Sequence, residues 1–230
     1  MFDNVAMVLG DPHRVNLLIR GMWITIQISL GAVILGLIIG TIMAAFNMSN
    51  LGFTIAGKKI RPLRIIAFVY LGVIRGTPAV TQLLIVSHTI FAAVRGVNLW
   101  VGIVALGINS GAYVAEIIRA GILSIDKGQM EAGLSLGFNK YQAMLFIVMP
   151  QAIKNILPTF INEFIVLIKE TAIVGFVGLQ DINRVGQLII AQTFSVTPLF
   201  ITAAMYLVLI SVLTWLLGKL EKKMRTSDRR

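Results

Sequence analysis

The sequence predicts an all-α membrane protein with five transmembrane helices and one polar segment between the third and the fourth. Two observations predict this fold. The 230 residues are 57% hydrophobic and only 13% charged, with a mean hydropathy of +0.87, whereas soluble domains are about 25% charged. The apolar residues also form runs that are too long and continuous for the alternating strands of a membrane β-barrel. We expect one transmembrane domain over residues 1–230.

The five predicted spans follow one another along the chain. The first contains an apolar stretch of 23 residues, Ile24–Phe46, which is enough to cross a hydrocarbon core of about 30 Å as a helix. The second contains Arg75 and Pro78, and the fourth is apolar but carries several polar residues. The predicted spans are residues 22–46, 65–90, 99–118, 156–174 and 198–218.

Lysine and arginine are distributed unequally between the two sides that five spans define. Loop 47–64, segment 119–155 and tail 219–230 together hold 14 of them, and the opposite side, including Arg95, holds four. Cytoplasmic loops of membrane proteins collect positive charge. We therefore expect a cytoplasmic C-terminus and an external N-terminus.

The net charge of +10 is explained by these loops, so it does not predict a nucleic-acid partner. Membrane lipid is the expected partner of the basic tail. The chain has no cysteine, and its two histidines, His13 and His88, are far apart, so we expect no metal site.

Segment 126–150 is the most polar stretch and predicts two short helices joined by a turn. Asp126 and Asn139 are suitable N-caps, each with glutamine three residues later. Gly137 stands where a helix C′ glycine belongs. Pro150 is expected to end the second helix.

The same segment resembles the EAA loop of ABC-importer permeases through Glu131-Ala132, Gly133, Gly137 and Met149-Pro150. The family usually has alanine where this chain has Gly133 and leucine where it has Met149. The resemblance implies a cytoplasmic coupling helix that docks on an ATPase through Glu131, Ala132, Gly133 and Gly137. Ala132 and Gly133 are small enough to let a partner surface approach closely. The alternative is an ordinary amphipathic helix at the membrane surface.

Further motifs resemble the polar amino-acid branch of these permeases, over residues 20–220. They are Arg75-Gly-Thr-Pro78 with Gln82, Ser110-Gly-Ala-Tyr-Val-Ala-Glu116, and Asn162-Glu-Phe with Lys169-Glu-Thr171. The resemblance implies a permease subunit in the cytoplasmic membrane of a prokaryote, without enzymatic activity or a bound cofactor. Its implied partners are a second permease chain, identical or different, two ATPase subunits that use ATP and magnesium, and an external solute-binding protein.

Charged residues inside the predicted spans are candidates for the substrate pathway, because a charge at mid-bilayer costs about 2.5–3.5 kcal/mol on insertion scales. Arg75 and Glu116 either pair with each other or face the pathway. Glu163 and Lys169 offer the anion and the cation that would bind an amino acid's termini, although Lys169 could instead form an outer gate or snorkel to the surface. The predicted pathway comprises Arg75, Thr77, Pro78, Asn109, Ser110, Tyr113, Glu116, Asn162, Glu163, Lys169 and Thr171.

An intramembrane anion such as Glu163 favours a cationic amino acid over a neutral or acidic one. The alternative function is a secondary transporter or channel that needs no ATPase, and this class would show paired repeats or broken helices. Residues 52–59 are close to a Walker A loop but have lysine at position 59 instead of serine or threonine. We therefore expect ATP to bind to a partner subunit. The pairs Gly36/Gly40, Gly72/Gly76 and Gly107/Gly111 predict close helix packing.

Overall fold

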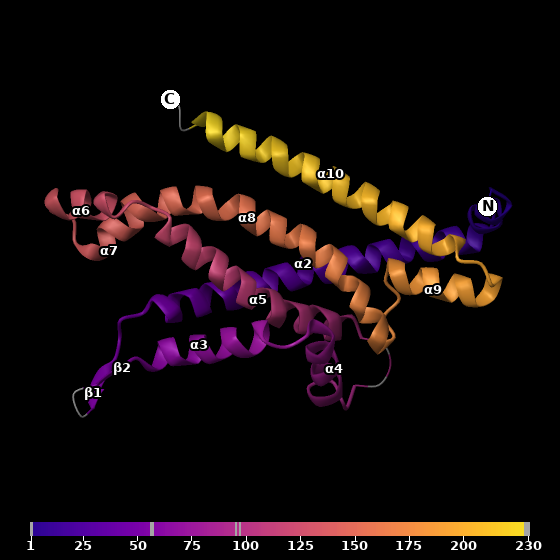
Figure 1. Ribbon diagram of the computed structural model, residues 1–230, viewed down its shortest axis with the longest axis horizontal. Coiled ribbons are helices and arrows are strands. Elements are labelled where there is room, and N and C mark those ends of the chain that lie inside the picture. Colours follow the sequence, from indigo (N-terminus) through magenta and orange to yellow (C-terminus); the bar gives the residue numbers. More distant parts are fainter. Residues whose placement is uncertain (1, 56–57, 95, 97, 228–230) are drawn as a thin grey trace.

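The computed structural model describes residues 2–55, 58–94, 96 and 98–227 and is helical apart from one short hairpin (Figure 1). Of the segments used above, residues 56–57 of the stretch 52–59, Arg95, and residues 228–230 of the tail lie outside the described residues. The helices are α1 (Phe2–Leu9), α2 (Pro12–Met48), α3 (Pro62–Arg75), α4 (Ala79–Thr89), α5 (Leu99–Leu123), α6 (Lys127–Ser135), α7 (Lys140–Ala143), a π-helix (Met144–Val148), α8 (Met149–Glu170), a 3₁₀-helix (Thr171–Val177), α9 (Ile182–Thr193) and α10 (Thr197–Ser227). The strands β1 (Phe53–Ile55) and β2 (Lys58–Ile60) pair antiparallel, and an all-α prediction did not include them.

Three helices of the described chain are long and apolar enough to cross a membrane: α2, α5 and the stretch Thr197–Lys219 of α10. The predicted span 65–90 was expected to be one helix, but it is broken into α3 and α4, which are bent by 108°. The pair counts as a fourth span if it is taken together. The fourth predicted span covers the second part of α8 and the start of the 3₁₀-helix. The helix α8 is not among the qualifying helices, because its polar residues dilute the apolar ones. The helical membrane class is confirmed, and the count of five spans stays a prediction.

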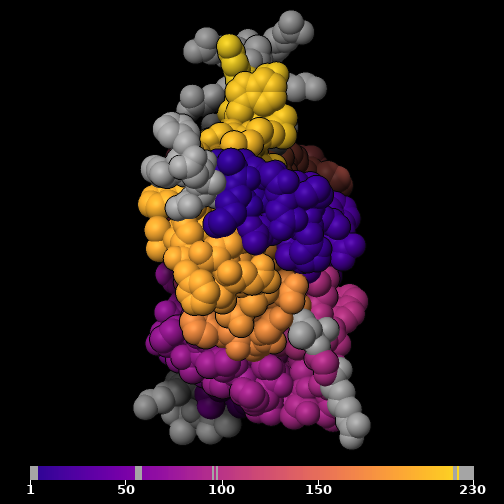
Figure 2. All heavy atoms as spheres, turned by 90° about the vertical axis from the view of Figure 1, so that its right-hand side faces the viewer, coloured from indigo at the N-terminus to yellow at the C-terminus, as the bar shows by residue number. Residues whose placement is uncertain are grey.

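The long helices run along the long axis of the molecule (Figure 1). The β1–β2 hairpin, α6 and α7 lie at one end, and α1 and α9 lie at the other. Figure 2 looks onto the second end and shows the indigo N-terminal helices beside α9 in orange, where Val8 and Leu18 pack with Val185 and Ile189. Two segments predicted to share one side of the membrane, 47–64 and 126–150, thus lie at the same end.

The α2–α5 interface is packed through glycines. A Cβ atom at Gly107 would lie 2.8 Å from Leu35, and one at Gly40 would lie 2.7 Å from Val114. Two of the three predicted glycine pairs therefore do allow close approach. The third does not, because a Cβ atom at Gly72 would meet nothing within 4 Å.

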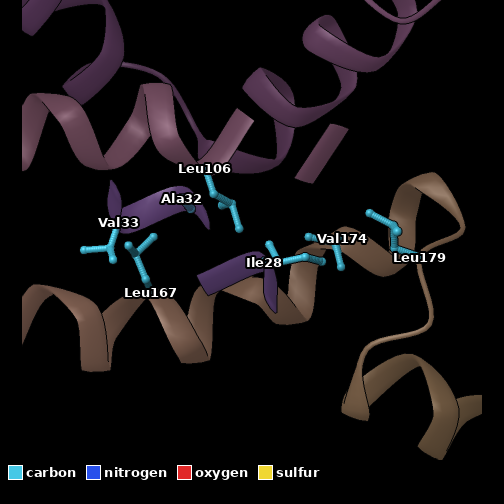
Figure 3. Packing of buried hydrophobic residues seen from close by; sticks show 7 residues of the cluster. All are labelled: Ile28, Ala32, Val33, Leu106, Leu167, Val174 and Leu179. Carbon is cyan, nitrogen blue, oxygen red and sulfur yellow. The ribbon is translucent and has the colours of Figure 1, made fainter. Parts of the chain in front are cut away.

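The largest hydrophobic cluster surrounds the middle of α2 (Figure 3). It joins α2 to α5, to α8 and to the segment that follows α8, and this arrangement fixes the helices that carry the polar residues described below. Its buried members are Ile28, Ala32, Val33, Leu106, Leu167, Val174 and Leu179.

Candidate functional site

The break between α3 and α4 is held by one glutamine. Pro78 forms the N-cap of α4 and cannot continue the preceding helix. The Nε2 atom of Gln82 donates to the carbonyl oxygen of Ile74 at 2.7 Å and to both oxygens of Thr77, at 2.8 Å and 3.1 Å. Its Oε1 atom accepts from Asn109 Nδ2 on α5 at 2.9 Å. Gln82 therefore satisfies the carbonyls that the break leaves open, as irregular backbone at membrane depth requires.

A buried carboxylate joins α8 to α5. Ser110 Oγ donates to Glu163 Oε1 at 3.0 Å, and Glu163 is 9% exposed. Gly36 on α2 leaves room for this hydroxyl, because a Cβ atom there would lie 3.0 Å from Ser110 Oγ. Every fully buried side-chain oxygen or nitrogen of the described residues has a partner. Among the described residues Oε2 of Glu163 accepts no hydrogen bond, and this oxygen is not fully buried.

Arg75 and Glu116 meet only loosely. Arg75 Nη1 lies 3.8 Å from Glu116 Oε1, whereas Arg119 Nη2 lies 2.8 Å from Glu116 Oε2. The guanidinium of Arg75 also stands 6.0 Å from the ring centre of Tyr113. All the charged side chains here are at least a quarter exposed. The predicted pair exists, and Arg119, which was not among the predicted site residues, is the stronger partner of Glu116.

An open groove of about 500 Å³ lies between α5 and α8, near the end that carries α6 and α7. This volume lies within the usual range for sites that bind small molecules. Asn155 on α8 closes part of its wall by donating from Nδ2 to Ser124 Oγ at 2.8 Å. Glu163 stands one helical turn beyond Thr159 along α8. The lining residues are Glu116, Ile117, Ala120, Gly121, Ser124, Asn155 and Thr159.

The other polar residues predicted on α8 do not converge with Glu163. Asn162 and Lys169 are exposed, and among the described residues no ion pair joins Lys169 to Glu163. The six-residue spacing of Glu163 and Lys169 puts the two charges on different faces of the helix. Thr171 is buried and donates to the carbonyl oxygen of Ile168 at 2.8 Å. The anion and the cation that we expected to act together therefore lie apart, with an inner carboxylate and an outer amide and ammonium.

The first helix, the turn and the start of the second helix predicted in segment 126–150 are present. Asp126 Oδ1 accepts from the N–H of Gly128 at 2.6 Å and caps α6. Gly137 has a φ of 88°, a left-handed conformation that favours glycine. Asn139 and Gln142 form a capping box, with both hydrogen bonds at 2.9 Å. Local rules of capping therefore predicted these three positions correctly.

Four residues of α6 and its turn were predicted to couple the chain to an ATPase. Glu131 and Ala132 are exposed at the surface of α6. Gly133 is buried, and a Cβ atom there would lie 2.6 Å from Ile147 Cδ1. Its small size serves packing inside the chain, not the approach of a partner surface as we expected. Gly137 turns the chain back after α6.

Pro150 does not end the second helix, contrary to the expectation. The chain runs from α7 through the π-helix directly into α8, where Pro150 occupies the first turn. Proline has no backbone N–H, and it is tolerated in the first turn of an α-helix because the N–H groups there have no partner within that helix. The π-helical turn before it is of the kind that occurs as an insertion inside longer helices. A pair of glutamines connects α8 to α6, because Gln151 Nε2 donates to Gln129 Oε1 at 3.2 Å. The same nitrogen also donates to the carbonyl oxygen of Ile147 at 2.8 Å.

One buried acid was missed at the end that carries α9. Asp181 is fully buried and accepts from the N–H groups of Asn183 and Arg184 and from Tyr206 Oη at 3.1 Å. Burial raises the pKa of the Asp181 carboxyl, and these hydrogen bonds oppose the rise. The available signal was an N-cap aspartate before Ile182. This contact ties α9 to α10.

Comparisons with known proteins agree on one family. Residues 48–226 match the family described as binding-protein-dependent transport system inner membrane component. The arginine transport system permease protein ArtQ of Bacillus subtilis is 38% identical over 94% of this chain and 95% of its own length. The glutamine transport system permease protein GlnP of Escherichia coli is 35% identical over 92% and 94%.

Solved structures give the same result. A chain of an amino acid ABC transporter crystallised with histidines is 39% identical, covers 94% of this chain and 98% of its own, and superposes with a TM-score of 0.84. The methionine ABC transporter MetNI, at 18% identity and a TM-score of 0.79, shares the fold.

Proposed function

Because this chain belongs to the binding-protein-dependent inner membrane components and is the permease subunit of an amino-acid ABC importer, we propose that its cargo is a polar amino acid and that Glu163 favours a cationic one. ATP hydrolysis belongs to a separate subunit in such importers. Two relatives are named for arginine and for glutamine, so these two amino acids are the most informative cargoes to compare.

The observation that carries the proposal is the environment of Glu163. Its carboxylate is buried between α8 and α5, with Oε1 bonded to Ser110 and Oε2 not fully buried. A buried carboxylate without a cation is costly, so a positively charged group that arrives along the groove would stabilise it. Lys169 lies on another face of α8, so the position beside the Glu163 carboxylate is available to a cationic substrate.

The pathway that we propose begins at the α5–α8 groove and continues toward the α3–α4 break. Glu116, Asn155 and Thr159 line its inner part. Arg75, Thr77 and Pro78 surround the break, and Tyr113 stands beneath Arg75. Exposed Asn162 and Lys169 of α8 would then face the second permease chain or the outer mouth.

The exposed face of α6 is the proposed docking surface for the ATPase, with Glu131 and Ala132 in contact and Gly133 and Gly137 shaping the helix–turn–helix beneath them. Two ATPase subunits bind ATP and magnesium, and two permease chains, identical or different, enclose the pathway. An external solute-binding protein delivers the amino acid. Closure of the ATPases moves the two α6 helices together and opens the bundle outward, in an alternating-access cycle.

The proposed topology has five spans, an external N-terminus and a cytoplasmic C-terminus. It can be tested with single cysteines, since the chain has none. An impermeant thiol reagent added to intact spheroplasts should label His13→Cys and leave Lys140→Cys unlabelled until the membrane is opened. Labelling of Lys140→Cys from outside would reverse the orientation.

Glu163→Gln tests the proposed cargo. Glutamine keeps the size of the side chain and the acceptor for Ser110, so the change removes only the charge. One charge-assisted hydrogen bond is worth roughly 1–3 kcal/mol, so uptake of arginine should fall about 5- to 150-fold more than uptake of glutamine in proteoliposomes with the ATPase and the binding protein.

Glu170→Gln is the matched control, because Glu170 is another partly buried carboxylate on the same helix. This variant should change both uptakes equally. Equal loss of both cargoes in Glu163→Gln would assign a structural role to that carboxylate. Full retention of both would remove Glu163 from the pathway.

A further inference from the structure

A second groove lies away from the proposed pathway, where the β1–β2 hairpin meets the start of α3. Its volume is about 540 Å³. The hairpin that forms one of its walls lies at the same end of the molecule as α6 and α7 (Figure 1). The hairpin comes from the stretch that resembles a Walker A loop, and the function proposed above does not use it. The lining residues are Lys59, Ile60, Arg61, Arg64, Ile65 and Phe68.

The groove gathers three cations that have no counter-ion among the described residues. Lys59, Arg61 and Arg64 line it together, and no carboxylate of the described chain lies within 4.0 Å of any of them. Three like charges gathered on one short stretch repel one another and attract an anion. The first turn of α3 adds to this attraction, because Arg61 at its N-cap makes no side-chain cap and the open end of a helix favours negative charge.

The remaining wall is apolar and continues along an exposed helix face. Ile65 is 53% exposed and Phe68 is 75% exposed, and both lie on α3 directly after the cations. Ile66 and Val69 extend this apolar surface farther along α3. The sequence of features along the chain is therefore a cationic head region followed by an apolar flank.

From this arrangement we propose that the groove binds an anionic phospholipid, with the headgroup phosphate among Lys59, Arg61 and Arg64 and the acyl chains along Ile65 and Phe68. Basic pockets on the cytoplasmic side of membrane helices bind anionic headgroups in this way. A soluble phosphate compound would use the cations but not the apolar flank. The proposal depends on the chain lying in a membrane and is independent of which amino acid it carries.

The test measures lipid retention by native mass spectrometry of the full chain, purified in micelles that contain either phosphatidylglycerol or phosphatidylcholine. The wild-type chain should retain phosphatidylglycerol preferentially, and added salt should weaken retention. A cation near an anionic headgroup contributes about 1 kcal/mol, or roughly fivefold in affinity. The combined variant Lys59→Gln, Arg61→Gln and Arg64→Gln should therefore lose at least about tenfold in affinity for phosphatidylglycerol.

A control variant removes the same charge elsewhere on the side predicted to be cytoplasmic: Lys127→Gln, Lys140→Gln and Lys154→Gln. It should retain phosphatidylglycerol within about twofold of wild type. Equal loss in both variants would mean general surface attraction and would overturn the site. If the groove variant fails to insert, the wild-type chain alone still tests the proposal. Equal retention of phosphatidylglycerol and phosphatidylcholine by the wild-type chain would contradict it.

Two additions distinguish the lipid from other anions. Millimolar inorganic phosphate or ATP should not displace phosphatidylglycerol from the wild-type chain. Displacement by either one would assign the groove to a soluble phosphate ligand. Unchanged lipid retention by the groove variant, together with lost binding of the ATPase subunit, would assign the surface to that protein.

Discussion

The two sides of α5 are built differently. Toward α2, glycines bring the helices into direct contact, with Leu35 against Gly107 and Val114 against Gly40. Toward α8, Gly121 lies against Ile156 and Leu106 shares a cluster with Leu167. However, two hydrogen bonds, Ser110 to Glu163 and Asn155 to Ser124, also cross this interface beside an open groove of about 500 Å³. The same helix therefore has one tightly packed face and one polar, partly open face.

This difference indicates which parts of the chain stay together during transport. Tightly interdigitated interfaces have little freedom to slide, so α2 and α5 form a scaffold. An interface that includes polar contacts and open volume can separate at lower cost. We therefore expect the alternating-access movement between α5 and α8, the helix that is continuous with the α6–α7 end.

The largest effect should come from changing α6, because α6 is the proposed docking surface for the ATPase and leads into α8 on the open side of α5. Glu131→Lys or Gly137→Asp is expected to reduce ATP-driven uptake to background while the chain still inserts, since the first reverses the charge of the exposed face and the second puts an acid at a left-handed turn. Uptake in proteoliposomes and the amount of inserted chain measure the two effects. Uptake at the wild-type rate with either change would remove α6 from coupling.

The tight side is tested by Gly111→Val. A Cβ atom there would lie 2.7 Å from Tyr70 Oη and 2.9 Å from Ile39, so we expect the free energy of unfolding in detergent to fall by about 3 kcal/mol. Gly72→Val is the matched control, because that position on α3 is open, and it should stay within about 0.5 kcal/mol. Equal losses in the two variants would contradict the scaffold.

The broken helix should show an intermediate effect. Gln82→Leu leaves the carbonyls of Ile74 and Thr77 and the amide of Asn109 without their partner, which should cost about 2 kcal/mol of unfolding free energy. Gln187→Leu, at an exposed position on α9 with one side-chain contact, should cost much less. Denaturant titration measures the unfolding free energy of both variants. Similar losses of unfolding free energy in the two would mean that Gln82 does not stabilise the break.

The smallest effect is expected on the open side. Ser110→Ala removes the hydrogen bond to Glu163 and should lower the unfolding free energy by about 1 kcal/mol. Ser135→Ala, at an exposed site on α6, is the control and should be nearly neutral. A loss for Ser110→Ala greater than that for Gly111→Val would reverse the comparison between the two sides of α5.

Features that depend on nearby residues were predictable from the sequence. The cap at Asp126, the capping box at Asn139 and the turn at Gly137 follow from short-range hydrogen bonds and backbone sterics. The long helices α2 and α5 follow from uninterrupted apolar residues. Glycine pairs on these two helices predicted close helix packing, but they did not specify which helices pack together.

Features that depend on distant partners were not predictable in the same way. In the sequence, residues 65–90 look like one continuous apolar span. The break at Pro78 depends on the side chain of Gln82 and its hydrogen bond to Asn109, which the sequence does not show. Burial of Gly133 depends on Ile147, which returns to it only after the turn. For the candidate site, the residue types around Glu163 were indicated by sequence, but the separation of Lys169 from it required the actual helix faces.

The π-helix at Met144–Val148 sets the angle at which α6 faces the rest of the chain. From Lys140 to Glu163 the backbone is an unbroken rod of about 35 Å, at about 1.5 Å per residue. A π-helical turn contains one residue more than an α-helical turn allows for, and each residue corresponds to a rotation of about 100° about the rod. Converting these five residues to regular α-helix would therefore swing the α6–α7 hairpin around the axis of α8 and point Glu131 in another direction.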